Sequence, residues 1–379
     1  MNLKNNSIPV LYYHSVANHN KVRPWSFLTC DIKTFEMQMR YIHKLGYRTC
    51  DWRELDNHML GINKQDDKCV HIQFDDGFLD NWTVVFPIMK ELNFKFSVVV
   101  TPDFIEKKVP RKFSKETNES NIEEWWGYLS EEELVLMEES GLVDIQAHGF
   151  SHTWYETSEN IIDLYDGTQV LPWLFWNNNI SEKATWLTNN SLNRIPLGYP
   201  IFENEKSLSN LKAYSVNREF IEDSIGMYNP NLSKEENLKN INILKDKYKQ
   251  NDMLGKYETE DETKKRLKNE LFNTRKHLKD ILNKEINYLV WPGGGNNEMV
   301  QDLAFEYGYI VISKGSELNS FNSQNRKISR VAAYHEFQPK VLRPYLNIIF
   351  IHLQILRANG NSFIDSLIRS IKKVKKMIR

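Results

Sequence analysis

Two adjacent carboxylates follow a strand-like run and could perform hydrolytic chemistry. The run extends from Val70 to Phe74, and Asp75 and Asp76 come directly after it. Catalytic groups of parallel α/β proteins lie at the carboxyl ends of strands. Because consecutive side chains diverge, one carboxylate can bind a metal ion while its neighbour acts as a base toward water. The alternative is a turn or a helix cap, since Asp-Gly, as in Asp76-Gly77, is common in turns.

Two histidines follow a second strand-like run. The run extends from Val143 to Ala147, and His148 and His152 come after it. Histidines four residues apart can face one ion, although in a chain with ten histidines they could also be structural residues. With Asp76 they would leave coordination positions open, as a catalytic metal site requires. We therefore expect one divalent ion, with Zn²⁺ as the first choice and Co²⁺, Ni²⁺ or Fe²⁺ as ions that the same ligands bind.

Two further strand ends carry weaker signals. The segment Trp-Pro-Gly-Gly-Gly at 291–295 follows a third run, and its glycines would let backbone N–H groups approach a ligand as an oxyanion hole needs. An ordinary loop can have the same composition. The first run, from Ile8 to His14, ends in a histidine that could transfer a proton.

These residues together resemble the polysaccharide deacetylase family of NodB homology. The segment Gln-Phe-Asp-Asp-Gly at 73–77 is similar to that family's first motif, Thr-Phe-Asp-Asp-Gly. The resemblance implies that Asp75 is the catalytic base and Asp76 a metal ligand. His148 and His152 resemble the second motif and would complete the ligand set, although Gly149 stands where the family usually has Ser or Thr.

The remaining motifs are altered. Trp-Pro-Gly-Gly at 291–294 is similar to the third motif, Arg-Pro-Pro-Tyr-Gly, in its Trp-Pro-x-Gly form. The arginine that steadies the base is absent there, and Arg330 is the candidate replacement. The family's last motif does not appear after Tyr309, but Tyr-Tyr-His-Ser-Val at 12–16 resembles the form of a permuted branch. His14 is then the candidate acid, with His335 as the second choice.

The implied reaction is the hydrolysis of an acetamide. Asp75 would remove a proton from the attacking water, the ion and the Gly293 N–H would stabilise the oxyanion, and His14 would protonate the departing amine. Sugar rings pack well on aromatic side chains, and six of the ten tryptophans lie around the second motif or early in the region after it. We expect most of the six to fill a small core and one or two to line the groove. The residues expected to bind the substrate are Trp154, Trp291, Pro292, Gly294 and Arg330.

Alternating β-rich and helical patterns predict an α/β fold with a parallel sheet. The resemblance implies a distorted (β/α)7-type barrel with a large insertion between the second and third motifs. We expect residues 1–154 and 263–335 to form the barrel, residues 155–262 the insertion, and residues 336–379 an amphipathic basic tail. The other expected elements are a helix from Phe35 to Gly46, a helix from Asp80 to Leu92, a strand from Phe96 to Val100, a helix opened by a Ser130–Glu133 capping box, a helix through Leu267 and Leu282, and strands at Tyr288–Trp291 and Tyr309–Ile312.

Composition narrows the function classes. The 49 basic and 50 acidic residues give a net charge of −1, so no global field attracts nucleic acid. The first fifteen residues lack the parts of a secretory signal peptide, and the three scattered cysteines fit reduced thiols, so we expect a cytoplasmic protein. At the carboxyl end, an apolar stripe from Phe363 to Ile378 accompanies six basic residues. Such a helix can contact an anionic membrane peripherally, or it can pack on its own barrel or on a dimer partner.

The sequence therefore predicts a metal-dependent hydrolase that removes an N-acetyl group from an amino sugar. The partner would be an N-acetylated sugar or a lipid-linked glycan, and a lipid-linked or nucleotide-linked precursor is favoured over finished cell-wall polymer. The alternatives are a deacylase of a non-sugar amide or formamide on the same fold, and an inactive carbohydrate-binding relative. A non-haem iron oxygenase uses a similar ligand set, but it would leave Asp75 and the glycine segment without a role.

Overall fold

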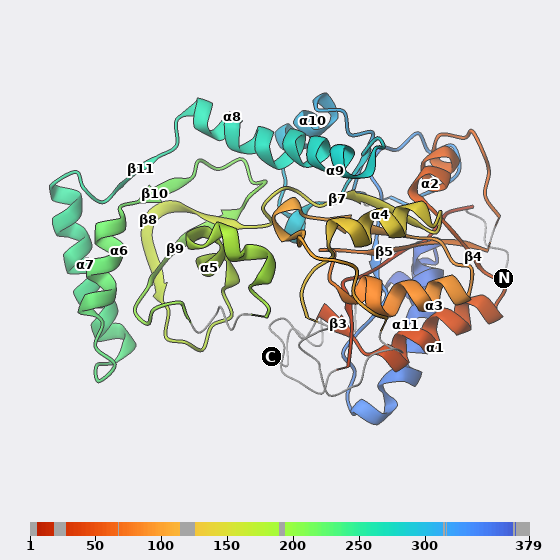
Figure 1. Ribbon diagram of the computed structural model, residues 1–379, viewed down its shortest axis with the longest axis horizontal. Coiled ribbons are helices and arrows are strands. Elements are labelled where there is room, and N and C mark those ends of the chain that lie inside the picture. The colour runs from red at the N-terminus through yellow and green to blue at the C-terminus, as the bar shows by residue number, and fades with distance from the viewer. Residues whose placement is uncertain are drawn as a thin grey trace.

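The computed structural model describes residues 6–18, 28–66, 68–113, 126–188, 194–313, 315, 317–366 and 368. Within them, a curled sheet surrounded by helices forms one lobe, and a smaller lobe extends from one side (Figure 1). We call the first the barrel lobe. We call the second, from residue 154 to residue 257, the insertion lobe.

The sheet of the barrel lobe is parallel throughout its paired strands. Its order is β13-β12-β7-β6-β5-β1-β14, and β4 also pairs with the start of β5. The apolar runs of the central strands are buried on both faces, as a parallel sheet covered by helices requires. The strands are β1 (Val10–Tyr13), β4 (Arg48–Cys50), β5 (Cys69–Phe74), β6 (Phe96–Val100), β7 (Val143–Ala147), β12 (Tyr288–Leu289), β13 (Val311–Ile312) and β14 (Val331–Ala332). A parallel pair outside this sheet joins β2 (Ser15–Val16) to β3 (Thr29–Cys30).

One segment of the chain connects the two edges of this sheet. Residues 326–328 exchange backbone hydrogen bonds with Ile312 of β13, and β14 a few residues later pairs with β1. The segment 326–332 therefore spans from one edge strand to the other and curls the sheet into a distorted barrel. Arg330 lies in the middle of this segment, which fixes its side chain beside the end of β5.

Helices cover the outside of the sheet. Apolar side chains at helical spacing, such as Phe35, Met39 and Ile42, face the main core. Ser130 and Glu133 form the predicted capping box, and α1 ends before Gly46, whose φ of +77° suits glycine. The helices of this lobe are α1 (Ile32–Lys44), α2 (Trp52–Met59), α3 (Phe86–Glu91), α4 (Glu131–Glu139), α9 (Thr274–Leu282), α10 (Glu298–Glu306) and α11 (Arg343–Ala358).

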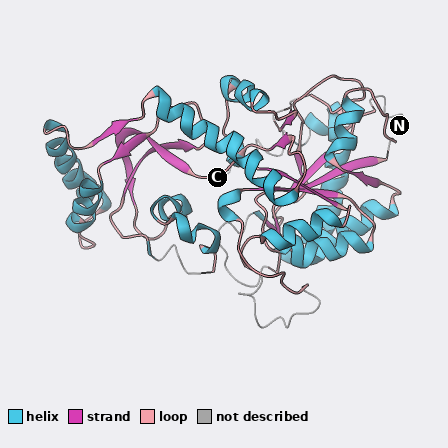
Figure 2. Cartoon of the chain, turned by 45° about the horizontal axis from the view of Figure 1, so that its top comes forward, coloured by secondary structure: helices cyan, strands magenta, loops and turns pink. Residues whose placement is uncertain are grey.

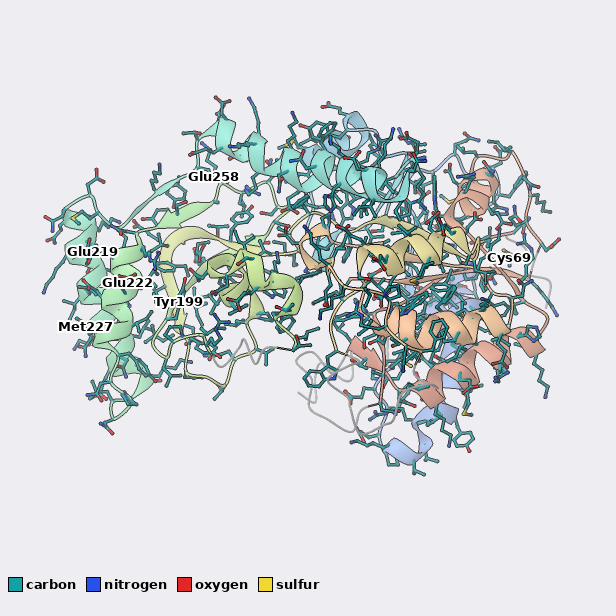
Figure 3. The ribbon with its side chains drawn as sticks, in the orientation of Figure 1. Cys69, Tyr199, Glu219, Glu222, Met227 and Glu258 are labelled. Carbon is teal, nitrogen blue, oxygen red and sulfur yellow. The ribbon has the colours of Figure 1, made fainter. Side chains whose placement is uncertain are left out.

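The insertion lobe has its own sheets and cores. β8 and β9 form a long antiparallel pair, and β10 and β11 form a second, short antiparallel pair (Figure 2). One apolar cluster contains Trp173, Trp176 and Trp186, and another surrounds Phe220. The side chains of Glu219, Glu222 and Met227 on α6 lie at the end of the molecule opposite Cys69 (Figure 3). The elements are β8 (Trp154–Leu164), α5 (Pro172–Asn178), β9 (Pro200–Lys206), β10 (Tyr214–Val216), α6 (Arg218–Met227), α7 (Lys234–Gln250) and β11 (Gly255–Tyr257), and α8 (Glu260–Lys268) returns to the barrel lobe.

Two predicted helices contain π-helical turns. The helix expected from Asp80 to Leu92 is a π-helical segment, η2 (Asn81–Val85), followed by α3. Pro87 has no N–H to donate within the helix, so it occupies the first turn of a new one. Likewise, the long helix expected through Leu267 and Leu282 is divided into α8, the π-helical segment η8 (Asn269–Asn273) and α9.

Other sequence predictions concern the ends of the chain and its thiols. Cys30, Cys50 and Cys69 are free and buried. Among the described residues, no helix is long and apolar enough to cross a membrane. The first part of the predicted tail, residues 336–379, contains α11, while residues 369–379, which carry the six basic residues, are outside the described residues. The proposed division of the chain at residues 155, 263 and 336 stays a prediction.

Candidate metal and catalytic site

The two carboxylates occupy a sharp turn at the end of β5. Asp76 and Gly77 both have positive φ, at +72° and +69°. A Cβ atom at Gly77 would lie 2.8 Å from Val100 Cγ1, so the turn requires glycine there. Asp76 is held in a conformation that non-glycine residues seldom adopt, which is common where geometry serves a site. The turn directs Asp75 and Asp76 into the same buried region from different angles.

Asp76, His148 and His152 converge on one point. The Nε2 atoms of His148 and His152 lie 3.1 Å and 3.2 Å from Asp76 Oδ1. One potential ligand atom from each residue lies within 4.8 Å of the others, and all three side chains are buried. The structure thus brings together the three residues that the sequence predicts as metal ligands.

The hydrogen bonding of this cluster fits a cation. His148 Nδ1 is 2.9 Å from the carbonyl oxygen of Val290, which can only accept, so Nδ1 carries the proton. In the neutral imidazole, the Nε2 lone pair then faces the Asp76 carboxylate. Protonating both imidazoles would instead place two charges on rings whose centroids are 5.1 Å apart. One divalent metal ion between the three groups satisfies them all, and two histidines with one carboxylate are suitable ligands for it.

Asp75 has a different set of partners. Arg330 Nη1 lies 2.8 Å and 3.0 Å from its two carboxylate oxygens, and Gln73 Nε2 donates to Oδ1 at 2.6 Å. Gln73 is itself fixed by the Tyr288 hydroxyl, which donates to its amide oxygen at 3.0 Å. Burial alone raises the pKa of Asp75, but the Arg330 guanidinium and nearby imidazoles outweigh it, so the pKa lies below its usual value. Asp75 is therefore an ionised carboxylate in a fixed orientation.

Arg330, the candidate replacement for the missing motif arginine, contacts the Asp75 carboxylate. Its Nη1 contact with Asp75 places the guanidinium behind the carboxylate, and its Cζ atom lies 4.8 Å from the centre of the Tyr12 ring. Arg330 is partly buried between these groups and lines the same cavity. The expected replacement by Arg330 therefore agrees with the geometry.

His14 lies on the other side of Asp75. Its Nε2 atom is 3.9 Å from Asp75 Oδ2, and its carbonyl oxygen accepts a hydrogen bond from Asn81 Nδ2 at 3.0 Å. Asp80 fixes the next residues, accepting from the Ser15 hydroxyl at 2.6 Å and from the Val16 N–H at 2.9 Å. His14 is thus anchored by the residues that open the π-helical segment η2.

His335, the second choice for the acid, lies elsewhere. Its ring stacks on Phe337 with centroids 4.6 Å apart and contacts Phe350 edge-on. His335 does not line the cavity that contains Asp75 and His14. Of the two candidate acids, the structure brings only His14 to the site.

The glycine segment after β12 forms another wall. Gly293, in η9 (Pro292–Gly294), has a φ of +55°, and it lines the cavity together with Trp291 and Gly294. Pro292, predicted to contact the substrate, instead packs under the histidine segment. A Cβ atom at Gly149 would lie 2.7 Å from Pro292 Cγ, and Gly149 has a φ of +71°. These two constraints explain why glycine replaces the usual Ser or Thr at this position.

A cavity of about 620 Å³ lies between the two lobes, and it is lined by the Asp76, His148 and His152 cluster together with Asp75, His14, Arg330 and Gly293. The insertion lobe contributes Trp154, Leu171, Trp173 and Asn204 to its lining. Trp176 and Trp186 are instead buried in the core of that lobe, and Trp125 lies outside the described residues.

Sequence reasoning missed several of the lining residues. Tyr12 could have been found, because it lies two residues before His14 in the same extended run and so points to the same face. Asn204 and Leu171 carry no local signal, since only the folding of the insertion lobe brings them to the site.

Comparisons with known proteins agree with this geometry. Residues 62–170 match the family model described as "Polysaccharide deacetylase", and this range includes Asp75, Asp76, His148 and His152. The chain therefore carries a polysaccharide deacetylase domain, as the motifs predict.

A curated relative and a solved structure give further detail. The chain is 28% identical over 145 residues to the "Putative polysaccharide deacetylase YxkH" of Bacillus subtilis (strain 168), which is 38% of this chain and 43% of that protein. It thus spans less than half the length of this relative. A de-N-acetylase from Aggregatibacter actinomycetemcomitans superposes with a TM-score of 0.53 at 16% identity, covering 90% of this chain and 99% of that one. At this identity the likeness concerns the fold, and the predicted distorted (β/α)7-type barrel of NodB-like deacetylases is confirmed.

The ligand set generates a direct prediction. Changing Asp76, His148 or His152 to Ala should remove bound metal, because two remaining ligands form a much weaker site. Elemental analysis of the purified, folded variants measures this. Asp75→Asn is the matched control and should keep its metal, since Asp75 is adjacent in sequence but contacts Arg330. Full metal content in His152→Ala would contradict the assignment.

Proposed function

We propose that this protein is a metal-dependent carbohydrate deacetylase that removes the N-acetyl group from an amino sugar of a glycan or glycan precursor. One observation carries the proposal. A carboxylate held ionised by Arg330 lies in the same cavity as the Asp76, His148 and His152 cluster, with His14 beside it. This arrangement separates a metal-binding carboxylate from a neighbouring carboxylate that is available as a base, as amide hydrolysis requires.

The residues of the chain divide the proton transfers between them. When bound, a divalent ion such as Zn²⁺ would polarise the acetyl carbonyl and lower the pKa of water to about 7. Asp75 takes a proton from the attacking water, through Oδ2, because Oδ1 accepts from both Gln73 and Arg330 whereas Oδ2 accepts only the longer Arg330 contact. The C–N bond then breaks as His14 Nε2 gives a proton to the amine, so that acetate and a free amino sugar leave. The Gly293 N–H adds a donor for the oxyanion.

The lining of the cavity favours a small, sugar-bearing substrate. Its volume of about 620 Å³ falls within the usual range for small-molecule sites of roughly 300–1,000 Å³. Trp154 and Trp173 supply aromatic surface of the kind on which sugar rings pack, and Asn204 supplies a polar amide. Because the insertion lobe covers one side of the site, we favour a lipid-linked or nucleotide-linked precursor over a long polymer.

The contact of Arg330 with Asp75 also weighs against one alternative. An inactive carbohydrate-binding relative is suggested by the missing motif arginine, but Arg330 supplies the equivalent charge. A deacylase of a non-sugar amide or formamide uses the same chemistry and differs only in what the cavity accepts. An iron oxygenase would not need an ionised Asp75, and acetate release without oxygen excludes it.

The metal-loaded protein should release acetate from lipid-linked or nucleotide-linked N-acetyl sugars. Asp75→Asn should lose activity by about 10²- to 10⁴-fold while keeping its metal, because a neutral amide cannot accept the proton from water. Acetate and free amine are measured on a panel of N-acetyl sugars, N-formyl compounds and simple amides. Turnover of the non-sugar amides alone would replace the proposal with the amide alternative, and no turnover of any substrate would contradict both.

A second prediction distinguishes the two candidate acids. His14→Ala should reduce the acetate release rate by a factor similar to that of Asp75→Asn, because the other two imidazoles that line the cavity, His148 and His152, face Asp76 as the proposed metal ligands. His335→Ala is the control and should keep a rate near that of the wild type. If His335→Ala were instead the slower variant, the assignment of His14 as the acid would be wrong.

We further propose that the carboxyl-terminal region contacts an anionic membrane peripherally. Val341, just before α11, and Tyr345 and Ile349 in α11 are 76%, 57% and 59% exposed, which gives this region an apolar surface. Near an anionic surface each basic side chain contributes roughly 1 kcal/mol of binding free energy. The expectation of a cytoplasmic protein stays a prediction.

Deleting residues 369–379 tests this contact. The deletion removes six basic residues but keeps Ile364 and Ile368, which are buried. Cosedimentation with anionic liposomes should fall and should depend less on salt, while hydrolysis of a small soluble N-acetyl sugar should be unchanged. Neutral liposomes are the control. Unchanged sedimentation, or loss of activity on every substrate, would contradict membrane docking.

A further inference from the structure

The four residues that end the second motif, 149–152, form a short loop, which we call the histidine loop. Its backbone N–H groups are bound from one side by a single carboxylate. Glu270 Oε2 accepts from the N–H groups of Phe150 and Ser151 at 3.0 Å and 3.1 Å, and Oε1 accepts from the Ser151 hydroxyl. Glu270 lies in the π-helical segment η8, and it is 3% exposed.

The carbonyl groups of the histidine loop are bound from the other side. Lys183 Nζ donates to the carbonyl oxygen of Ser151, and the N–H of Asp103 donates to that of Phe150 at 3.2 Å. Lys183 also pairs with Asp103 Oδ2 at 3.1 Å. It comes from η6 (Ile180–Thr185) of the insertion lobe and is 2% exposed, with its Nζ atom 5.2 Å from the centre of the Phe104 ring.

The histidine loop needs external support of this kind. Gly149 and His152 have φ values of +71° and +47°, so the loop has no regular secondary structure of its own. A buried ammonium group and a buried carboxylate are unfavourable unless each is paired. Here most of their partners are groups of this loop, and the others are the Ser207 hydroxyl and the Asp103 carboxylate. Neither Lys183 nor Glu270 lines the cavity, so neither contacts the substrate.

We propose that Lys183 and Glu270 are positioning residues that set His152 in place for the metal ion. By this inference, which rests on the proposed metal site, the insertion lobe controls metal affinity as well as covering the substrate. His148 is held independently, through its Nδ1 contact with the carbonyl of Val290. Residues that orient metal ligands typically change metal affinity by about 10- to 100-fold when they are substituted.

The experiment compares metal affinity in folded variants. Glu270→Gln and Lys183→Met should each bind Zn²⁺ about 10- to 100-fold more weakly than the wild type, as measured by competition with a chromophoric chelator. The Co²⁺-loaded variants should have altered visible absorption, because His152 is displaced from its position. Ser151→Ala removes one donor to Glu270 without leaving a charge unpaired, so it should fold and show a smaller loss in the same direction.

Lys284→Met is the matched control. Lys284 pairs with Glu138 and with Asp144, which lies near the start of β7, at the opposite end of the strand from His148. The substitution should lower the thermal unfolding temperature without changing the affinity for Zn²⁺. Circular dichroism establishes that each variant is folded.

The outcomes separate this inference from the proposed function. Wild-type affinity in Ser151→Ala and in the folded Glu270→Gln and Lys183→Met variants, or an equal loss in Lys284→Met, would overturn the positioning role. If the wild type binds Zn²⁺ but hydrolyses no N-acetyl substrate, the proposed function fails while the positioning role is still judged by affinity. If the wild type binds none of Zn²⁺, Co²⁺, Ni²⁺ and Fe²⁺, both are overturned.

Discussion

Two adjacent carboxylates are buried at the end of one strand, and each needs its own compensating charge to stay ionised there. For Asp75 that charge is Arg330, which reaches the site because residues 326–332 connect the two edges of the sheet. For Asp76 it is the cation that His148 and His152 would share with it. Three features keep the Asp75–Arg330 pair apart from the Asp76 cluster although the two carboxylates are neighbours. They are the curvature of the barrel, the sharp turn after β5 and the histidine loop.

Local sequence signals were sufficient to predict an element or a site residue wherever a pattern repeated or a motif had fixed spacing. Strands β6 and β7 have the predicted bounds, and Ser130 caps α4 as its spacing with Glu133 indicates. The π-helical turns were not predictable in this way, because a single wider turn hardly changes the spacing of apolar residues. Contacts such as those of Asn204 and Lys183 depend on how a separate lobe folds, and isolated polar residues in an irregular region give no indication of their partners.

The two π-helical segments have a common role. Residues that open η2 bind the backbone around His14, since Asn81 donates to its carbonyl and Asp80 accepts from Val16. Glu270 in η8 binds the backbone next to His152. In both places a wider turn presents a polar side chain to an irregular segment that bears a histidine, and π-helical turns are frequent at functional sites for related reasons. The spacing of apolar residues therefore did not predict the two helical segments that support the site.

Strand β8 of the insertion lobe begins at Trp154, two residues after a predicted metal ligand. Only one residue of the chain therefore separates His152 from Trp154, which forms part of the cavity wall with Trp173. Lys183 connects the insertion lobe to the histidine loop a second time, through the carbonyl of Ser151. Thermodynamic linkage makes such a connection reciprocal. If a ligand that stabilises the lobe against the barrel raises the affinity for the metal by some factor, the metal must raise the affinity for that ligand by the same factor. Occupancy of the cavity and retention of the ion then form a single coupled equilibrium.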